Sequence, residues 1–362
     1  MSKILLINPN KWGRGITHIW IASHSGLLKR NGHEVKLFDS TFYQDWHKSL
    51  NKEEEYKPTD LDKFVKQNKN DILKDLQNLI NNFKPDIIFW SAISSHIHSE
   101  GEYVNLQNGY DLIKNIHYAK PVLLITGGLQ AISAPKIILD KMNKIDFLVR
   151  GESELTLLEI ANNFRNKENL LMIKGIAYKK DNKIIQNPRQ EILKSLDLLC
   201  PYDYEIFSEQ IFYKPYNGEV LKGIDYEMSR GCIYSCSYCV ETIIQKYYGF
   251  DEKSSTSGAI KNFKSYLRHK SPENIYSELK YLNKKLSVKL IRCQDTNFLT
   301  INRDVLIKLS KLIIENPLDI KLYIETRPEG INEKSVELLK NLKVDGVAMG
   351  VETADEGFRE DQ

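Results

Sequence analysis

Short apolar runs recur through the first part of the chain with helical patterns between them, and this alternation limits the possible folds more than any other feature. The runs are residues 4–7, 35–38, 87–90, 122–125 and 147–149. The helical patterns between them cover residues 19–29, 72–83, 109–116 and 135–142. Buried strands that alternate with helices form parallel sheets with helices on both faces. The sequence therefore predicts an α/β fold with a doubly wound, parallel, Rossmann-like sheet over residues 1–165.

A second series of strand and helix patterns follows a connector. Residues 166–222 contain a predicted β-hairpin around Asp181-Asn182, then three prolines among many aromatic residues. We expect this connector to wrap between two domains, with its aromatic side chains used mainly for packing: Tyr202, Tyr204, Phe207 and Tyr213. Over residues 223–362, four strands are predicted, at 226–228, 290–293, 322–325 and 347–349. Repeated β-α units with polar strand ends predict a partial (β/α) barrel, in which active residues gather at the carboxyl ends of the strands.

Three cysteines lie in one short loop of the second domain. Cys232, Cys236 and Cys239 have the spacing CxxxCxxC. A four-iron cubane held by three thiolates keeps one iron open for a substrate or a second cofactor. A structural zinc site is the alternative, but zinc prefers four ligands and the sequence offers no second cysteine pair. Five cysteines in 362 residues are too sparse for a disulfide framework. The spacing therefore favours an iron–sulfur cluster.

Composition excludes some classes of function. The net charge is +3, from 51 basic and 48 acidic residues, so the sequence does not indicate a nucleic-acid-binding protein. No apolar run approaches the roughly 20 residues that a membrane-spanning helix needs. The N-terminal residues lead directly into the first predicted strand, so we expect no secretory segment and a cytoplasmic location.

The cysteine loop resembles that of the radical S-adenosylmethionine (SAM) enzymes. The similarity comprises the spacing, Tyr238 before the third cysteine, and Arg230-Gly231 before the first. It implies that Cys232, Cys236 and Cys239 ligate a [4Fe-4S] cluster, that SAM chelates the fourth iron, and that reduction releases a 5′-deoxyadenosyl radical. Later strand ends also resemble the family: Gln294–Phe298, Glu325–Arg327 and Gly350–Thr353. This resemblance implies SAM contacts from Asp295, Glu325, Arg327 and Glu352.

The first domain resembles the cobalamin-binding domain that precedes many radical SAM enzymes. The matching features are Asn8-Pro9 after the first strand, Gly127-Gly128 after the fourth, and Arg150-Gly151-Glu152-Ser153-Glu154 after the fifth. They imply that cobalamin lies on the strand ends. The implied contacts are Ser91, Ser94, Ser95, Gly127, Gly128 and Ser133.

One departure concerns the lower face of the cobalt. Many cobalamin proteins carry DxHxxG, whose histidine binds cobalt, but the nearest string here, at residues 45–50, lacks the glycine and follows the second strand. His47, His96 and His98 are weak candidates for this ligand, and the lower axial ligand stays open.

Together these resemblances imply a cobalamin-dependent radical SAM enzyme whose most favoured reaction is methyl transfer to an unactivated carbon. The alternatives are a cobalamin-linked radical cyclisation, ring contraction or rearrangement, and a truncated, non-catalytic cofactor-binding paralogue. The resemblance also implies an external electron donor such as flavodoxin or ferredoxin. The family's partial barrel has about six strands, so four strands lead us to expect a fragment of a longer protein. No residue pattern identifies the substrate.

Overall fold

A seven-stranded sheet forms the first half of the protein in a computed structural model, which describes residues 1–11, 15–46, 61–91, 102–252 and 259–350, with residues 354, 355 and 357. The strand order is β2-β1-β3-β4-β5-β6-β7. The five parallel strands are β1 (Lys3–Asn8), β2 (Glu34–Asp39), β3 (Ile87–Ser91), β4 (Leu123–Gly127) and β5 (Phe147–Val149). This confirms the predicted doubly wound sheet.

The hairpin predicted in the connector belongs to this first sheet. It consists of β6 (Ile176–Lys180) and β7 (Lys183–Gln186), and β6 pairs antiparallel with β5. The sequence identified the hairpin from its turn but not its partner, because edge pairing depends on how the strand meets a distant neighbour.

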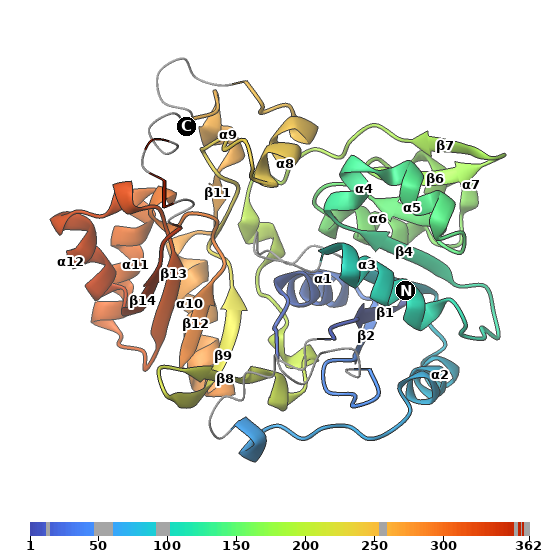
Figure 1. Ribbon diagram of the computed structural model, residues 1–362, viewed down its shortest axis with the longest axis horizontal. Helices are drawn as coiled ribbons and strands as arrows, with labels where there is room; N and C mark the ends of the chain where they lie inside the picture. Colours follow the sequence, from blue (N-terminus) through green and yellow to red (C-terminus); the bar gives the residue numbers. More distant parts are fainter. Residues whose placement is uncertain are drawn as a thin grey trace.

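Helices cover both faces of the first sheet (Figure 1). Alternate residues along each strand point to opposite faces, and each face has its own apolar cluster. The helices packed on one face are α1 (Ile19–Arg30) and α6 (Glu154–Asn163). Those on the other face are α2 (Ile72–Phe83), α3 (Glu102–Ile113), α4 (Leu129–Ser133) and α5 (Pro135–Lys141). A short helix, α7 (Lys167–Met172), leads to the hairpin.

Helix α2 shows how the sequence sets these bounds. Its buried residues are Ile72, Leu76, Ile80 and Phe83, a spacing that forms one stripe along a helix. The side chain of Asp71 accepts a hydrogen bond from the backbone N–H of Lys74 at 3.0 Å, which caps the first turn. Lys84 ends the helix in a left-handed conformation.

Helix α3 lies so close to the first sheet that only glycine fits at one position. A Cβ atom added to Gly109 would lie 2.2 Å from Cδ1 of the buried Trp90. We expect Gly109→Ala to lower the free energy of unfolding by about 1–3 kcal/mol through overpacking. Alanine is intrinsically better than glycine in a helix by about 1 kcal/mol. A lowered free energy of unfolding therefore indicates overpacking, and a raised one indicates that helix propensity prevails. A raised melting temperature in a thermal unfolding experiment would contradict the close packing.

A second sheet forms the other half, with the order β14-β13-β12-β9-β8. Its parallel strands are β9 (Glu219–Tyr226), β12 (Leu290–Cys293), β13 (Lys321–Glu325) and β14 (Val344–Ala348), and β8 (Tyr213–Tyr216) pairs antiparallel with β9. The first of these strands thus ends at Tyr226, where the sequence pattern placed its beginning. The helices of this half are α8 (Glu241–Tyr248), α9 (Phe263–Tyr266), α10 (Pro272–Leu286), α11 (Arg303–Glu315) and α12 (Glu333–Asn341). A separate ribbon pairs β10 (Ser229–Arg230) with β11 (Arg268–His269).

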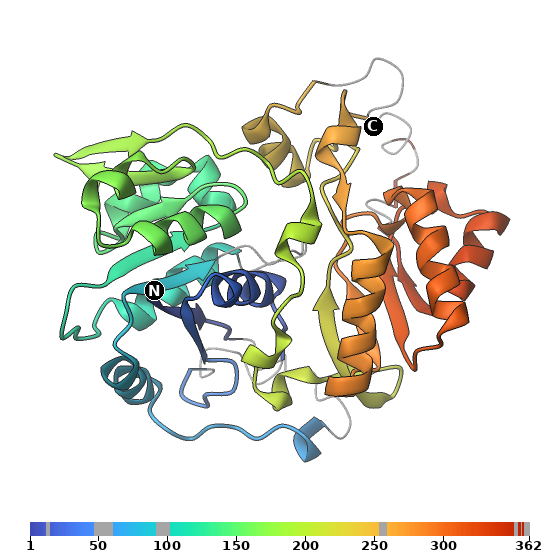
Figure 2. The same ribbon diagram turned by 180° about the vertical axis from the view of Figure 1, so that it is seen from behind.

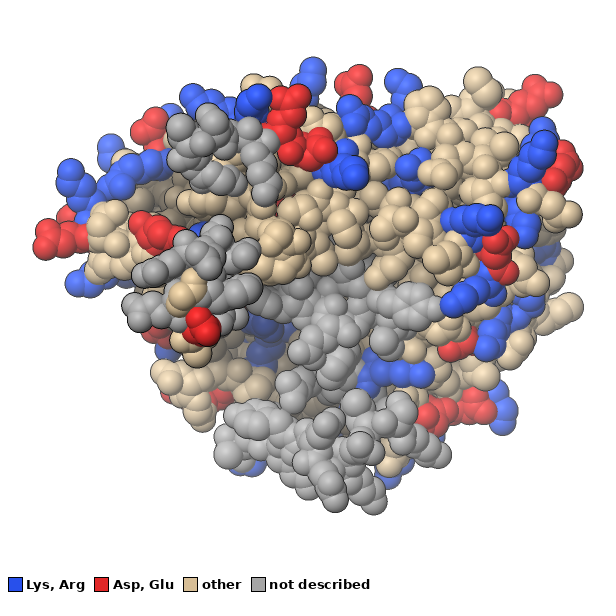
Figure 3. All heavy atoms as spheres, turned by 45° about the horizontal axis from the view of Figure 1, so that its top comes forward, with Lys and Arg blue, Asp and Glu red and all other residues tan. Residues whose placement is uncertain are grey.

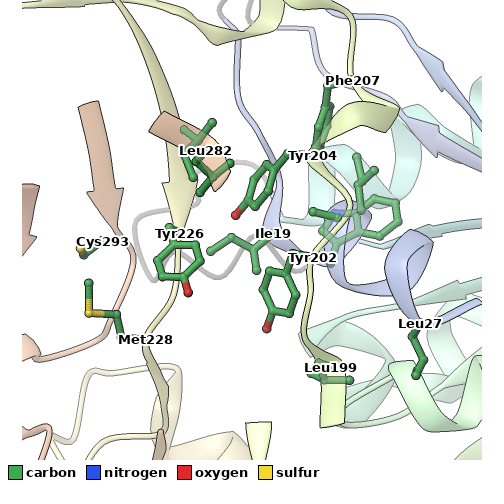
Figure 4. Close-up of a cluster of buried hydrophobic side chains, with 14 of the residues drawn as sticks. Ile19, Leu27, Leu199, Tyr202, Tyr204, Phe207, Tyr226, Met228, Leu282 and Cys293 are labelled. Carbon is green, nitrogen blue, oxygen red and sulfur yellow. The ribbon is translucent and has the colours of Figure 1, made fainter. Parts of the chain in front are cut away.

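The connector binds the two halves together (Figure 2). It contains short 3₁₀ turns at Leu196–Leu199, Tyr204–Ile206 and Glu209–Phe212; similar turns occur at Leu61–Lys63, Phe298–Thr300 and Pro328–Gly330. Tyr202, Tyr204 and Phe207 are buried in one apolar cluster with Ile19 of α1 and Tyr226 of β9 (Figure 4). Their packing role was expected from the sequence, whereas Tyr213 stays only half-buried.

Charged side chains of both signs are mixed on the surface. On the face drawn in Figure 3, basic and acidic residues alternate along the rim, without a one-sign patch on the described residues. This distribution agrees with the near-balanced net charge. Within the described ranges, no helix has both the length and the apolar character needed to cross a bilayer.

Candidate functional site

The cysteine loop follows β10 and leads into α8. It begins at Gly231, whose φ is +95° and whose Cα lies against the Tyr266 carbonyl: a Cβ atom there would be 2.7 Å from that oxygen. The Gln245 side chain of α8 donates hydrogen bonds to the carbonyl oxygens of Cys232 (3.0 Å) and Tyr234 (2.9 Å). Helix α8 therefore fixes the path of the loop from the far side.

The three thiols of this loop differ in exposure. Cys232 is buried, and Cys236 and Cys239 are half-buried. Burial raises the pKa of the Cys232 thiol to about 12, and nearby Glu241 and the other two cysteines add to the rise. A buried thiol with this pKa stays protonated by itself, and a bound metal offsets the cost of forming the thiolate.

The described residues contain no group of three His, Cys, Asp or Glu side chains placed to hold a single metal ion. A cubane has a different requirement, because each of its cysteine ligands binds a different iron. Three thiols in one short loop that is held at both ends fit that donor set.

Arg327 reaches the cysteine loop from the end of β13. Its guanidinium donates a hydrogen bond to Cys236 Sγ at 3.7 Å and lies 4.5 Å above the ring of Tyr234. It also pairs with Glu329 at 2.5 Å, and this partner raises the Arg327 pKa. The structure thus brings Arg327 to the cysteines, although the two residues are 91 positions apart.

Asp295 also contacts the approach to the loop. It is 1 % exposed, and its carboxylate accepts hydrogen bonds from Ser229 Oγ (2.6 Å) and from the backbone N–H groups of Ser229 (2.5 Å) and Met228 (3.1 Å). Burial raises the pKa of Asp295 to about 7, against the lowering effect of these hydrogen bonds. Its position at the carboxyl end of β12 agrees with the strand-end pattern. Glu325 is half-buried at the end of β13, and Glu352 lies outside the described residues.

The carboxyl ends of the first sheet supply a second group of predicted site residues. Ser91 and Gly127 are register partners at the ends of β3 and β4. Gly128 follows with a φ of +123° and begins α4, whereas the Ser133 hydroxyl donates to Leu129 O within that helix at 3.2 Å. Five further candidates lie outside the described residues: His47, Ser94, Ser95, His96 and His98.

The strand order makes this edge a candidate position for a bound ligand. β1 lies between β2 and β3, so the connection that follows β1 runs to one side of it and the connection that follows β2 crosses to the other side. Ligands of such sheets bind at this switch point, beyond the carboxyl ends of the strands. The β1–β2 side is closed by a hydrogen bond of 3.1 Å from Asn8 Nδ2 to Asp39 Oδ2. The β3–β4 side, with Ser91, opens to a cavity.

This cavity of about 160 Å³ lies between the two halves. Lining residues from the first half include Trp20, His24, Ser91 and Leu129; those from the second half include Ser229, Arg230, Gln294 and Thr296. Gln294 Oε1 is buried and has no hydrogen-bond partner, while its amide nitrogen donates to Asp225 at 3.0 Å. Gln294 therefore has a buried oxygen whose hydrogen-bonding capacity is unused within the part of the chain that the structure describes. His24 was not identified from the sequence, because nothing in its helical pattern distinguishes it from a core residue.

Comparisons with known proteins agree with this geometry. Residues 226–361 match the radical SAM superfamily. The chain is 25% identical over 283 residues to an uncharacterised methyltransferase of Pyrococcus horikoshii, covering 77% of this chain and 54% of the relative. It is 25% identical over 238 residues to an anaerobic magnesium-protoporphyrin IX monomethyl ester cyclase of Synechocystis sp., covering 65% and 43%. The chain thus spans about half the length of these relatives.

A solved structure shares the fold over nearly the whole chain. It is TsrM from Kitasatospora setae, a radical SAM methyltransferase with cobalamin and a [4Fe-4S] cluster bound. The TM-score is 0.67 at 15% identity, and the match covers 97% of this chain and 59% of TsrM. This likeness establishes the architecture of two joined α/β halves.

Proposed function

We propose that the protein is a cobalamin-dependent radical SAM methyltransferase, a proposal supported by the match of residues 226–361 to the radical SAM superfamily. The observation that carries this proposal is that the two ends of the cysteine loop, Gly231 and Val240, border the same cavity as Ser91 and Leu129 at the carboxyl ends of β3 and β4. When bound, the [4Fe-4S] cluster with SAM supplies a radical for hydrogen abstraction, and cobalamin supplies the methyl group for an unactivated carbon. The chain's own residues hold, orient and shield these groups.

The second half holds the cluster and SAM in this proposal. Cys232, Cys236 and Cys239 ligate three irons and keep the fourth accessible. The SAM-binding residues are Asp295, Glu325, Arg327 and Glu352. Arg327 suits an anionic group because its guanidinium forms charge-assisted hydrogen bonds to carboxylates.

The first half holds cobalamin. We assign the contacts to Ser91, Ser94, Ser95, Gly127, Gly128 and Ser133. Gly128 supports close approach of a large ligand, because glycine has no Cβ atom to cover the backbone; its positive φ also favours glycine at this position. The binding edge is the switch point of the sheet, where flat cofactors bind in folds of this strand order.

A radical cyclisation is the second candidate. It is favoured by the cyclase relative from Synechocystis, which matches this chain at the same identity as the methyltransferase relative. The two reactions differ in the fate of the SAM methyl group. Methyl transfer places it in the product, whereas a cyclisation leaves it on methionine.

Electron delivery completes the proposal. The cluster needs a low-potential, one-electron donor, for which flavodoxin or ferredoxin is suitable. Such donors and thiolate-ligated clusters require a reducing compartment, so we assign the protein to the cytoplasm.

Anaerobic purification followed by metal analysis tests the proposal directly. We expect about four irons per chain, with the broad visible absorption of a cubane. After incubation with cobalamin, we expect retained cobalt. A chain that binds iron but no cobalt would contradict the role of the first half.

Product analysis of the reduced protein with SAM then separates the reactions. 5′-Deoxyadenosine indicates an enzyme, and a methylated product distinguishes methyl transfer from cyclisation. Neither product, despite an intact cluster, would favour a non-catalytic cofactor-binding protein.

A further inference from the structure

Two arginines lie side by side at the base of the cysteine loop. Arg230 in β10 is the register partner of Arg268 in β11, in an antiparallel pair of only two residues each. Their side chains are 14% and 6% exposed. Two like charges directly opposite one another destabilise such a ribbon. The ribbon therefore needs negative partners, and Cys232 follows Arg230 by only two positions.

The first half provides these partners. At the start of α6, Glu154 Oε1 accepts a hydrogen bond from Arg230 Nη2 at 2.7 Å. Glu152 Oε1 accepts one from Arg268 Nη1 at 2.7 Å and lies 3.7 Å from Arg230 Nη1. The two carboxylates thus join both strands of the ribbon to the segment of the first half that runs from the end of β5 into α6. We call Glu152, Glu154, Arg230 and Arg268 the carboxylate clamp.

The clamp is fixed on the first-domain side as well. The hydroxyl of Ser23 in α1 donates to Glu154 Oε1 at 3.1 Å, and the backbone N–H of Leu193 donates to Glu152 Oε2 at 3.1 Å. Gly151, with a φ of +84°, lets Tyr248 approach so closely that its hydroxyl accepts the Glu152 N–H at 2.7 Å. Both ends of the clamp are therefore rigidly held.

Glu154 keeps its negative charge despite burial. Burial by itself raises the pKa of Glu154, but attraction to Arg230, then to His24, outweighs it and lowers the pKa to about 2. Only one further acid in the second half contacts Arg230 among the described residues: Glu227, at 2.7 Å. The clamp residues also border the cavity, yet their charges already satisfy one another. They are thus suited to hold the loop rather than to bind a ligand.

We propose that Glu152 and Glu154 of the first domain are positioning residues for the iron–sulfur cluster, acting through Arg268 and Arg230 on the cysteine loop. The inference rests on the proposed function, because it assumes that this loop holds a cluster. It assigns the first domain a role in cluster retention that is separate from binding cobalamin. A change that loosens the docking of the first sheet should then also change the geometry of the three thiolates.

The test compares the rate of iron loss to a chelator in the full chain, under anaerobic conditions, for wild type, Glu154→Gln and Glu152→Gln. Outer residues that orient metal ligands typically change metal affinity by about 10–100-fold, so we expect about 10-fold faster iron loss in either variant. Glu159→Gln is the matched control, because Glu159 is exposed on the same helix as Glu154. This control should lose iron at the wild-type rate.

A double variant distinguishes positioning from general destabilisation. If Glu154 acts through Arg230, then Glu154→Gln combined with Arg230→Gln should lose iron no faster than Arg230→Gln alone. Additive effects would indicate independent damage and would overturn the proposal. The electron paramagnetic resonance spectrum of the reduced cluster should also change in Glu154→Gln and not in Glu159→Gln.

The remaining outcomes are also decisive. If Glu154→Gln does not fold, Arg268→Lys carries the same test. Lysine keeps the charge but loses the planar guanidinium, whose Nη1 donates to Glu152 while its Nε donates to Tyr266 O at 2.8 Å. If the wild-type chain holds a cluster and the variants lose iron as slowly as wild type does, the clamp is overturned and the proposed function is not. A wild-type chain that takes up no iron overturns the proposed function, and the clamp with it.

Discussion

Replacing Cys236 with alanine should abolish the iron–sulfur cluster. With only two cysteines left in the loop, a second iron loses its protein ligand, and the cubane is no longer held. We expect the iron content to fall from about four per chain to near zero, together with the visible absorption. The fold should persist, because Cys236 is half-buried in a loop and contributes little to either apolar core.

Cys200→Ser provides the matched control. Cys200 is also half-buried, and its thiol contacts Leu196 O and Glu278 Oε2 at 3.8 and 3.6 Å, which a serine hydroxyl can replace. Iron content in this variant should equal that of wild type. Unchanged iron in Cys236→Ala, or equal loss in both variants, would show that the loop cysteines are not the cluster ligands.

Gly231→Ala should have a comparably large effect without removing a ligand. The added Cβ atom would lie 2.7 Å from the Tyr266 carbonyl oxygen, which belongs to the backbone and cannot turn away. The φ of +95° adds backbone strain for any residue with a Cβ. Because Cys232 comes next in the chain, the displacement should pull the first thiol out of place, and we expect loss of most of the iron.

Gly218→Ala separates the effect of backbone strain from the effect of a steric clash that displaces the loop. Gly218 has a φ of +81° in the turn between β8 and β9, but an added Cβ atom would meet nothing within 4 Å. This variant should lose about 1–2 kcal/mol of stability from the left-handed conformation and keep its iron. Measured iron content and melting temperature for the pair test the argument. Equal iron in both variants would mean that the contact with Tyr266 does not fix the loop.

The two variants address different parts of the same loop. Cys236→Ala tests the identity of the ligands, whereas Gly231→Ala tests whether the surrounding backbone positions them. Asp295 belongs to the second category as well, since its carboxylate holds the backbone of Met228 and Ser229 before the loop. The contacts at the candidate site thus include many that shape the loop.

Much of the architecture could be predicted from local patterns. The spacing of Ile72, Leu76, Ile80 and Phe83 predicted α2 with its observed bounds, because a helix is stabilised by contacts within four residues. The turn at Asp181-Asn182 predicted the β6–β7 hairpin for a similar reason. Its attachment to β5 was not predictable in this way, because pairing with a neighbouring strand depends on the assembled sheet.

The sequence by itself determined the donor set, since three thiols within eight residues are held near one another by the covalent chain. It also determined the order of strands and helices, through apolar periodicity. Only the tertiary structure decided that Glu154 meets Arg230, 76 residues away, and that Arg327 reaches Cys236. The first contact depends on how the two sheets dock, which is set by the shared apolar cluster and the connector rather than by any local pattern. The second depends on packing within the second half, which brings the end of β13 to the loop after β10. For this reason the proposed cluster ligands could be identified from the sequence, whereas the residues proposed to position them could not.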